Sequence, residues 1–392
     1  MRIGLVLSKT PGYSETFFTS KIKGLQAHGL EPILFVQYKE TDFNLCSVQV
    51  SPKVYRNSFV QLLAMVVVFV KLISAMRTVY RFIQLEREQG TNTSSIIKRT
   101  YLNAHILSKR LDWLHFGFAT MALEKENLAK AIGAKMAVSF RGFDIAIYPL
   151  KHPSCYTKLW KHVDKVHTIS NDLLEKAYKL GLSKNVPVQK ITPAIDANFF
   201  SSEENNAPKV NGPIKLLTVG RLHWKKGYVQ MLEALAILKK NGIPFVYTIV
   251  GSGTKKEEEE IIFAAHQLNI KDEIVFAGKK NREEVKMYYK NAEIYLQYSI
   301  SEGFCNAVLE AQSMKKLCIV SNAEGLAENV LHKKTGWVVP KFKPELLATQ
   351  IEQIIKLSET EKTQLTDYAA DRVMKEFTVE KQQKEFVKFY DL

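Results

Sequence analysis

The chain has 392 residues, which is more than a single hydrophobic core usually accommodates and suits two or three domains. Apolar residues make up 46% and charged residues 24%, so disordered and collagen-like chains are excluded. The four cysteines (Cys46, Cys155, Cys305 and Cys318) are widely spaced, which excludes a disulfide framework and a cysteine zinc site and favours a reducing compartment. No uninterrupted apolar run reaches about 18 residues, so we expect no conventional membrane span.

The formal net charge of +15 is concentrated in the first half of the chain. Residues 1–200 hold 27 Lys and Arg against 14 Asp and Glu, whereas residues 201–392 hold 28 against 26. A basic first half favours anionic partners, such as nucleic acid, acidic lipid head groups or phosphorylated substrates.

Short apolar runs alternate with longer helical stretches along the chain. The first half predicts strands at 2–7, 32–36, 135–140, 165–169 and 188–191, and the second at 214–219, 245–250, 273–276, 293–297, 317–320 and 336–339. Such alternation is typical of parallel sheets covered by helices, and the number of units indicates two sheets. We therefore expect an α/β protein whose N-terminal domain spans 1–200 and whose C-terminal domain spans 214–377. A polar linker is predicted at 201–213, and an amphipathic helix at 378–392 is predicted to pack back on the first domain.

One segment departs from this alternation. Residues 59–73 are mostly apolar, and Lys53, Arg56, Lys71 and Arg77 flank them. A basic-flanked apolar helix of this length fits the plane of a membrane interface, with its cations held by acidic lipids. The alternative is a helix buried in the first domain with a solvated basic rim.

The run from Ser301 to Ala311 (SEGFCNAVLEA) follows a predicted strand and leads into a helix, with Asn306 expected as the N-cap. Backbone N–H groups at such a helix start form an anion site. Glu302 and Glu310 lie beside it, and carboxylates there suit the hydroxyl groups of sugars, since an ionised carboxylate only accepts hydrogen bonds.

A second run, Val219 to Gly227 (VGRLHWKKG), follows the strand 214–219. Arg221 and Lys226 are thereby predicted in a strand-to-helix loop at the carboxyl edge of a parallel sheet, where open α/β sheets bind their ligands. Two fixed cations at that edge could neutralise a diphosphate, although a lone Lys-Lys-Gly is more often a solvated turn.

These motifs together resemble the retaining glycosyltransferases of family 4, which have the GT-B fold, and in particular bacterial enzymes of surface-polysaccharide synthesis. The resemblance rests on Gly220-Arg221 and Lys226-Gly227 followed by the pair Glu302-x7-Glu310. It extends over nearly the whole chain in the family's order, through Tyr13 to Phe17, His115-Phe116-Gly117, Gly142-Phe143-Asp144, Ser170, Ile195-Asp196, Glu328 and Thr335 to Pro340.

The resemblance implies two Rossmann-like domains that face each other across a cleft, and it assigns roles to individual residues. As catalytic residues, Arg221 and Lys226 would grip the donor diphosphate and Glu302 would hold the donor sugar. The other donor-binding residues would be Gly303, Phe304, Glu310 (at the ribose), Val275 and Gly278 (beside the base). On the acceptor side the resemblance points to Glu15, His115, Arg141 and Asp144.

Arg141 departs from the family pattern, which often has His before Gly-x-Asp. An arginine stays charged and cannot act as a general base. The pair of glycines usual before Glu328 is also altered, to Glu324-Gly325-Leu326-Ala327. The chain has no Asp-x-Asp and no metal-ligand spacing of histidines, so we expect no metal requirement and no cofactor beyond the nucleotide sugar itself.

The sequence thus predicts a hexosyltransferase-type enzyme (EC 2.4) that moves a sugar from a nucleotide donor to a lipid-linked or polysaccharide acceptor, with the anomeric configuration retained. We expect it in the cytoplasm, on the inner face of the plasma membrane, bound to acidic lipid through residues 53–87. A GT-B-type epimerase or phosphorylase and a non-catalytic basic membrane-binding protein are the alternatives. Nucleic acid is not an expected partner, because the basic runs lack interleaved aromatic residues.

Overall fold

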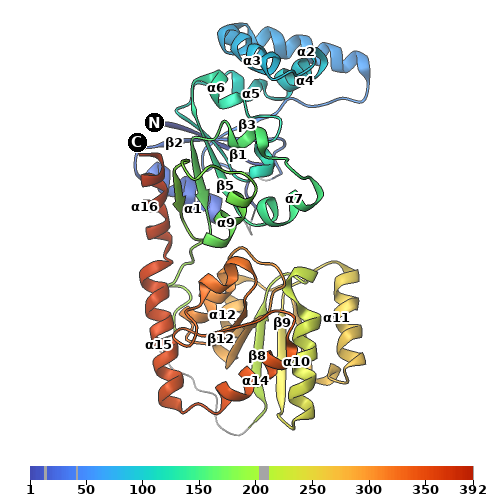
Figure 1. Ribbon diagram of the computed structural model, residues 1–392, viewed down its shortest axis with the longest axis vertical. Coiled ribbons are helices and arrows are strands. Elements are labelled where there is room, and N and C mark those ends of the chain that lie inside the picture. The colour runs from blue at the N-terminus through green and yellow to red at the C-terminus, as the bar shows by residue number, and fades with distance from the viewer. Residues whose placement is uncertain (13–15, 41–42, 203–211, 392) are drawn as a thin grey trace. The chain divides into compact units, whose positions relative to one another are not determined.

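The computed structural model describes residues 1–12, 16–40, 43–202 and 212–391 of the chain. It divides into two compact units (Figure 1). The first comprises Met1–Ile191 and Gln382–Leu392, and the second comprises Thr192–Lys381. Most of the polar segment predicted as a linker, 203–211, lies outside the described residues.

The first unit is built on a parallel sheet of seven strands in the order β3-β2-β1-β4-β5-β6-β7. Its strands are β1 (Arg2–Val6), β2 (Glu31–Val36), β3 (Ser47–Val50), β4 (Trp113–Phe116), β5 (Lys135–Phe140), β6 (Lys165–Thr168) and β7 (Val188–Lys190). All five strands predicted for this half are present. The prediction missed β3 and β4, two strands of four residues that contain Gln49 and His115.

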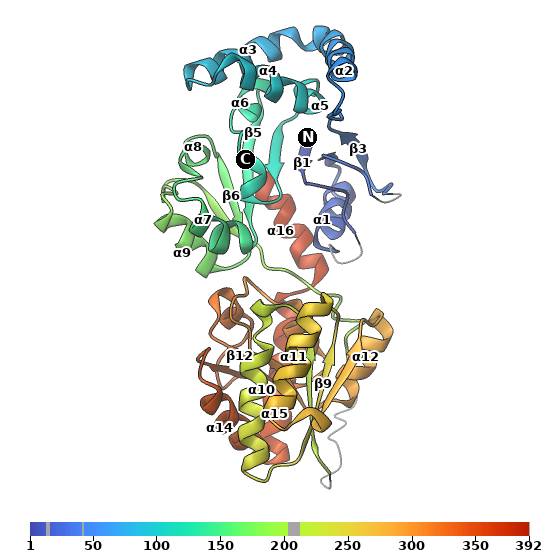
Figure 2. The ribbon, with the colours of Figure 1, turned by 90° about the vertical axis from the view of Figure 1, so that its right-hand side faces the viewer.

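Helices surround this sheet, and one group of them forms a separate layer at one side of it, here called the outer layer (Figures 1 and 2). The helices are α1 (Thr16–Ala27), α2 (Ser58–Lys71), α3 (Met76–Glu88), α4 (Thr93–Leu102), α5 (Ala104–Leu107), α6 (Leu128–Ile132), α7 (Tyr148–Lys151), α8 (Thr157–Trp160) and α9 (Asn171–Lys179), with the shorter turns η1 (Leu72–Ala75), η2 (Ala119–Ala122) and η3 (Phe143–Ile147). The outer layer consists of α2, α3 and α4.

The end of the chain returns to the first unit through α16 (Val379–Tyr390). Its side chains Phe386, Phe389 and Tyr390 are fully buried. They belong to the same hydrophobic core as Ile3 and Leu5 of β1. Burying three aromatic side chains removes several hundred Å² of surface from water, at roughly 150–250 Å² each, so the last turns of α16 belong to the folding unit of the first sheet.

The second unit contains a parallel sheet of six strands in the order β10-β9-β8-β11-β12-β13. The strands are β8 (Ile214–Val219), β9 (Phe245–Val250), β10 (Ile274–Gly278), β11 (Ile294–Gln297), β12 (Leu317–Ser321) and β13 (Trp337–Val339), each within two residues of its predicted bounds. The helices are α10 (Tyr228–Lys240), α11 (Lys255–Gln267), α12 (Arg282–Asn291), α13 (Asn306–Ser313), α14 (Pro344–Ile355) and α15 (Glu359–Glu376), with the short turns η4 (Trp224–Lys226), η5 (Lys271–Glu273) and η6 (Glu324–Asn329).

The helices of the second unit cover both faces of its sheet. Helices α10, α11 and α14 pack on one face, and α13 and α15 pack together on the other (Figure 1). The core lies where Met231 and Leu235 of α10 and Ile351 of α14 meet Tyr247 and Ile249 of β9. Numbered from its own first strand, this sheet has the order 3-2-1-4-5-6 of a Rossmann fold, and the first six strands of the other sheet follow the same order. The predicted α/β architecture of two Rossmann-like domains is confirmed.

Candidate active site

In the second unit the strand order reverses between β8 and β11, the first and fourth strands of the sheet. Ligands of open α/β sheets bind outside the carboxyl ends of the strands at such a reversal. Lys226 lies in the loop after β8 and Glu302 in the loop after β11, and the Lys226 Nζ is 2.5 Å from the Glu302 Oε2. Two residues that are 76 positions apart thus form a part-buried ion pair at the expected binding position.

Backbone contacts fix the loop that carries Lys226. The N–H of Ile300 donates to the Lys225 carbonyl over 2.7 Å, so the loops after β8 and β11 are joined directly. Gly227 has φ +67°, and a Cβ at this position would overlap the carbonyl oxygen of Tyr298. Glycine is therefore required here for both its conformation and the close approach of the two loops.

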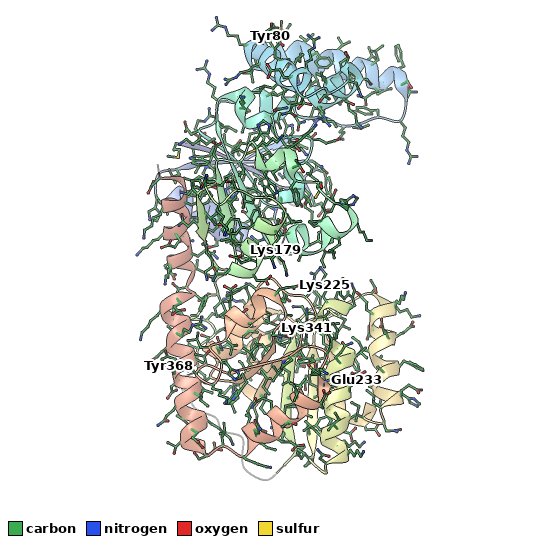
Figure 3. All side chains as sticks on the ribbon, viewed as in Figure 1. Tyr80, Lys179, Lys225, Glu233, Lys341 and Tyr368 are labelled. Carbon is green, nitrogen blue, oxygen red and sulfur yellow. The ribbon has the colours of Figure 1, made fainter. Side chains whose placement is uncertain are left out.

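The loop after β9 is held against the same place. A Cβ on Gly251 would overlap the carbonyl oxygen of Gly220, and the Leu222 N–H donates to the Ser252 carbonyl over 3.1 Å. The sequence Gly251-Ser252-Gly253, which alone indicates only a turn, thus packs directly against the loop that carries Arg221. Figure 3 shows Lys225 and Lys341 at the end of the second unit where these loops gather.

Two residues that sequence reasoning did not place in the site hold the turn before α13. The Asn329 side chain accepts from the Cys305 N–H (3.1 Å) and donates to the Cys305 carbonyl (2.9 Å). The Glu324 carboxylate accepts from the Glu302 N–H over 2.7 Å. Because a carboxylate already sits at one of these N–H groups, the turn has the polarity of an anion site. The departure from the family pattern at Glu324 marked this residue as unusual, but nothing in the sequence indicates that it contacts Glu302.

The helix α13 begins at Asn306, and its N-cap is Cys305, whose side chain makes no capping hydrogen bond to the helix. The expectation that Asn306 caps the helix was therefore wrong by one residue. The reason is that Asn329, from a distant turn, satisfies the backbone of Cys305 on both sides.

Glu310 lies one turn into α13, where the Tyr289 hydroxyl of α12 donates to its Oε2 over 3.0 Å. Burial raises the pKa of the Glu310 carboxyl to about 7, although the Tyr289 hydrogen bond and the charge of Arg282 act in the opposite direction. Lys226 behaves differently, because the neighbouring carboxylate of Glu302 outweighs burial and raises the pKa of its ammonium. Lys226 is a fixed cation, whereas Glu310 changes charge near neutral pH.

Of the remaining residues predicted to bind the donor, some lie at the carboxyl edge of the second sheet and one does not. Arg221 is exposed in the loop after β8, and Gly278 ends β10 with its carbonyl accepting from the Gly251 N–H. The Phe304 side chain is buried against Phe377, so only its backbone is available to a ligand. The structure thus brings Arg221, Lys226, Glu302, Gly303 and Gly278 to one sheet edge. Val275 lies near the amino end of β10, paired with Thr248, and is not at that edge.

The acceptor-side predictions fall in the first unit, where His115 is buried on β4. Its Nδ1 lies 2.5 Å from the Tyr390 hydroxyl and 3.1 Å from the Lys21 Nζ, and its Nε2 lies 2.8 Å from the Ser139 Oγ. Burial and the nearby Lys21 lower the pKa of this imidazole, so it is neutral. The structure therefore places His115 in a buried polar network that ties α16 to the sheet.

Asp144 is also buried, and its carboxylate accepts from the backbone N–H groups of Arg141 (3.1 Å), Gly142 (2.9 Å) and Ala119 (3.0 Å). It shapes the loop after β5 and has no exposed surface for an acceptor. The Arg141 guanidinium lies over the ring of Phe17, with its Cζ 3.8 Å from the centroid. Glu15 lies outside the described residues.

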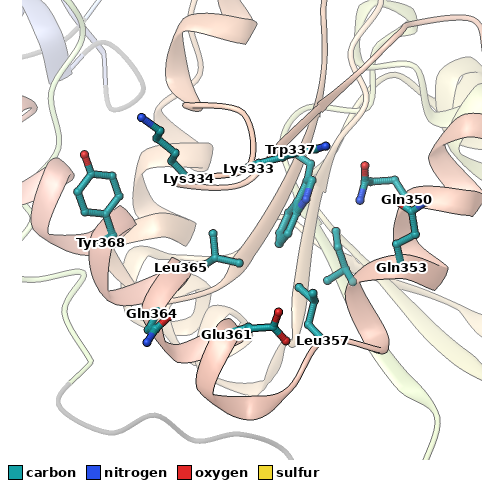
Figure 4. Close-up of a pocket in the computed structure, with 11 residues that line it drawn as sticks. Lys333, Lys334, Trp337, Gln350, Gln353, Leu357, Glu361, Gln364, Leu365 and Tyr368 are labelled. Carbon is teal, nitrogen blue, oxygen red and sulfur yellow. The ribbon is translucent and has the colours of Figure 1, made fainter.

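A further hollow in the second unit has a volume of about 540 Å³ and lies beside β13, α14 and α15 (Figure 4). Trp337, at the amino end of β13, forms part of its floor with Leu357 and Leu365. This hollow contains none of the predicted site residues and lies at the opposite end of the strands from Lys226 and Glu302. Among the described residues, no cluster of three or more His, Cys, Asp or Glu side chains could hold a metal ion.

Comparison with known proteins identifies the fold and a partial family match. The fold is that of the two-domain GT-B glycosyltransferases. A solved structure of Anabaena Alr3699/HepE in complex with UDP superposes with a TM-score of 0.73 over 99% of this chain and 98% of that chain, at 14% sequence identity. Residues 200–372, which make up most of the second unit, match the family model described as glycosyl transferases group 1.

Two curated relatives are similar in sequence. The amylovoran biosynthesis glycosyltransferase AmsK of Erwinia amylovora is 29% identical over 246 residues, which cover 60% of this chain and 58% of that protein. WcaL of Escherichia coli K12, named as a candidate glycosyltransferase of colanic acid biosynthesis, is 28% identical over 274 residues, 67% of this chain and 66% of its own length. The matches therefore span less than two thirds of these relatives.

Proposed function

We propose that the protein is a retaining glycosyltransferase that moves a hexosyl group from a nucleotide-sugar donor to an acceptor in surface-polysaccharide synthesis. The observation that carries this proposal is the Lys226–Glu302 pair at the strand-order reversal of the second unit. A phosphate-binding cation and a sugar-binding carboxylate side by side match the two halves of a nucleotide sugar.

In this proposal the donor lies along the carboxyl edge of the second sheet. Its diphosphate meets Lys226, Arg221 and the N–H groups at the start of α13, and its ribose hydroxyls donate to Glu310. Lys226 then exchanges part of its contact with Glu302 for the diphosphate, which leaves the Glu302 carboxylate free to accept from the sugar hydroxyls. A solved structure of the same fold was obtained in complex with UDP, which is consistent with a nucleoside diphosphate as part of the donor.

Glu302 is a poor candidate for the nucleophile of a double displacement. Its carboxylate is held by Lys226 at 2.5 Å before the donor binds, and in this proposal it accepts from the sugar hydroxyls once the donor has bound, so it is engaged in both states. We therefore favour attack of the acceptor hydroxyl on the face that the diphosphate leaves. The bond from the anomeric carbon to phosphate oxygen breaks with its electron pair going to the diphosphate, the acceptor oxygen forms the new bond, and a phosphate oxygen takes the acceptor proton. Lys226 and Arg221 stabilise the charge that develops on the leaving group.

The acceptor is proposed to be a lipid-linked or polymeric saccharide, reached from the cytoplasm. Support comes from the two curated relatives, whose names place them in amylovoran and colanic acid biosynthesis. The exposed apolar surface of the first unit, described below, is consistent with an acceptor held in a membrane.

The proposal is tested by incubating the protein with a panel of nucleotide sugars and measuring binding, release of the nucleoside diphosphate, and the anomeric configuration of the product by NMR. We expect one donor class to bind and turn over, with retention. Lys226→Ala should lower turnover roughly a hundredfold or more, because a lost charged contact at a developing negative charge costs about 3 kcal/mol. The matched control is Lys255→Ala, on the highly exposed first turn of α11, which should leave turnover unchanged. Near-normal turnover in Lys226→Ala, or an inverted product, would contradict the proposal.

The same assay separates the alternatives. A GT-B-type epimerase would return the nucleotide with an isomerised sugar and no acceptor product. A phosphorylase would need inorganic phosphate and a lysine-bound pyridoxal group, which a visible absorption band would reveal.

A further inference from the structure

The first unit presents an apolar helical surface on its outer layer. The helical stretch Ser58–Glu88 comprises α2, η1 and α3 in direct succession. Nine large apolar side chains along it are between 51% and 69% exposed: Phe59, Leu62, Leu63, Val66, Val67, Val70, Ile73, Met76 and Tyr80. Because they recur at intervals of three and four residues, they lie on one continuous face, which we call the apolar stripe. Figure 3 shows Tyr80 on this helical layer, at the top of the view.

The opposite side of the same stretch rests on the unit. Val68 and Phe69 are half-buried, and Leu72, Phe82 and Leu85 are buried. No residue of α2 is buried, and only 6% of the most apolar 18-residue window is buried. The alternative of a core helix with a solvated rim is therefore wrong. Monomeric soluble proteins rarely expose a contiguous apolar patch of this extent.

The charged residues that flank the apolar stripe are basic as far as residue 85, and the buried Glu86 and the exposed Glu88 follow at the end of α3. Residues 43–85 contain five cations, all exposed (Lys53, Arg56, Lys71, Arg77 and Arg81), and no Asp or Glu. Along α2 and η1 the exposed face is almost wholly apolar, whereas along α3 Arg77 and Arg81 share it with Tyr80. The surface therefore changes along its length from apolar to basic and aromatic.

We propose that the stretch Ser58–Glu88 binds the surface of a lipid bilayer that contains anionic head groups. The apolar side chains of α2 and η1 enter the boundary between head groups and acyl chains, and Arg77, Tyr80 and Arg81 of α3 lie at head-group level. This division follows the preferences of apolar, aromatic and basic side chains at a membrane interface. The inference concerns the first unit and does not depend on the reaction proposed for the second.

Two other occupants fit the stripe less well. The stretch has 31 residues and is long and apolar enough to cross a membrane by length and composition. Crossing would, however, pull the buried Phe82, Leu85 and Glu86 out of the first unit, where the Glu86 carboxylate is 2.7 Å from the part-buried Arg99 guanidinium. A second copy of the chain would bring a basic surface against the same basic surface, and like charges would repel.

The test is sedimentation of the full chain with two kinds of vesicle, one of phosphatidylcholine alone and one of phosphatidylcholine mixed with phosphatidylglycerol. We expect binding to the mixed vesicles at low salt, weak binding to the neutral ones, and partial release as salt shortens the screening length. Arg77→Glu with Arg81→Glu should lower the binding constant at least tenfold, since each cation near an anionic surface contributes roughly fivefold. Lys255→Glu with Lys256→Glu, on the exposed start of α11, is the matched control and should have a much smaller effect.

The apolar half of the proposal has its own variants. Leu63→Gln with Val67→Gln should weaken binding strongly without lowering the thermal unfolding temperature, because both side chains are more than half exposed. Phe263→Gln, at a side chain on α11 that is also more than half exposed, is the control and should change neither quantity.

Three results would overturn the proposal. The first is equal binding of wild type and both double variants to mixed vesicles. The second is a dimer in light scattering without lipid that the Leu63/Val67 variant disperses, which would assign the stripe to a second copy. The third is retention in the bilayer after an alkaline carbonate wash, which would indicate a spanning helix. Nucleotide binding measured on the same preparations keeps this outcome separate from that of the proposed function.

Discussion

The most specific prediction concerns Glu310, the carboxyl whose pKa burial raises to about 7. A carboxylate accepts from both hydroxyls of a ribose, whereas a protonated carboxyl must donate one of its own hydrogen bonds. Nucleotide binding at this position should therefore require the ionised form. At pH 6 only a minor fraction of Glu310 is ionised, and at pH 8 most of it is.

The size of the effect follows from that fraction. Apparent affinity falls in proportion to the population able to bind, so raising the pH from 6 to 8 should tighten nucleotide-sugar binding about tenfold. Calorimetry with an intact nucleotide sugar is the assay, because both phosphates of such a donor are esterified and do not titrate in this range. Glu310→Gln should bind more weakly at pH 8 and lose the pH dependence. A tenfold dependence that persists in Glu310→Gln would show that another group is responsible.

The same pKa predicts a stability effect of definite sign. In the unfolded chain Glu310 loses its proton near its ordinary pKa of about 4.5, so between that value and about 7 the folded state binds the extra proton. Stability must then fall as pH rises through this window, by up to about 3 kcal/mol for this group. Thermal unfolding across pH 5 to 8 should show wild type losing stability relative to Glu310→Gln. The opposite trend would mean that Glu310 is ionised in the folded protein and that the pKa argument is wrong.

Three further substitutions test other parts of the geometry. Glu302→Gln should lower turnover by about two orders of magnitude. Binding of a free nucleoside diphosphate should be kept or tightened, because Lys226 loses its competing partner. Equal loss of binding in calorimetry and of turnover in a steady-state assay would contradict this division of roles. Gly227→Ala should weaken nucleotide binding and destabilise the protein, since its Cβ would overlap the Tyr298 carbonyl. The control is Gly242→Ala, at a glycine of similar φ with open space around it. This control should lower the unfolding free energy by only about 1 kcal/mol. Asp144→Asn should cost about 1–3 kcal/mol of unfolding free energy, because its amide NH₂ cannot accept from the N–H groups that the carboxylate now satisfies; an unchanged unfolding temperature would refute this.

Much of the fold could be predicted from the sequence because parallel strands buried on both faces are continuous apolar runs. All eleven predicted strands are present, and the two that were missed show the limit of that signal. The run of β4 is interrupted by His115, which is tolerated in the core only because Ser139 and Tyr390 satisfy its ring nitrogens. That compensation comes from residues 24 and 275 positions away, and no local pattern contains it.

The placement of the candidate site residues was predictable where it depends on strand ends and unpredictable where it depends on burial. Arg221, Lys226 and Glu302 follow strands, and parallel strands bring their carboxyl ends to one edge, so sequence position was sufficient. His115 and Asp144 also follow or belong to strands, yet their side chains are directed into the first unit. The Asp144 carboxylate accepts from three backbone N–H groups, and the His115 ring is hydrogen-bonded to the Tyr390 hydroxyl of α16. A motif identifies such residues, but only the packing shows that they act through the loop or helix that they hold.

In the proposed donor site, the Lys226–Glu302 pair would keep the charge of Lys226 compensated before a diphosphate binds. A lone part-buried ammonium would lose solvation and repel Arg221 in the same loop, and Glu302 offsets both costs. A diphosphate carries more negative charge than one carboxylate, so it can replace Glu302 as the main partner of Lys226 without leaving a buried charge uncompensated. The released carboxylate is then beside the phosphate, which is where the hydroxyls of the attached sugar must lie. The proposal thus couples sugar recognition to diphosphate binding, and it predicts that a free monosaccharide binds poorly because nothing releases Glu302 to contact it.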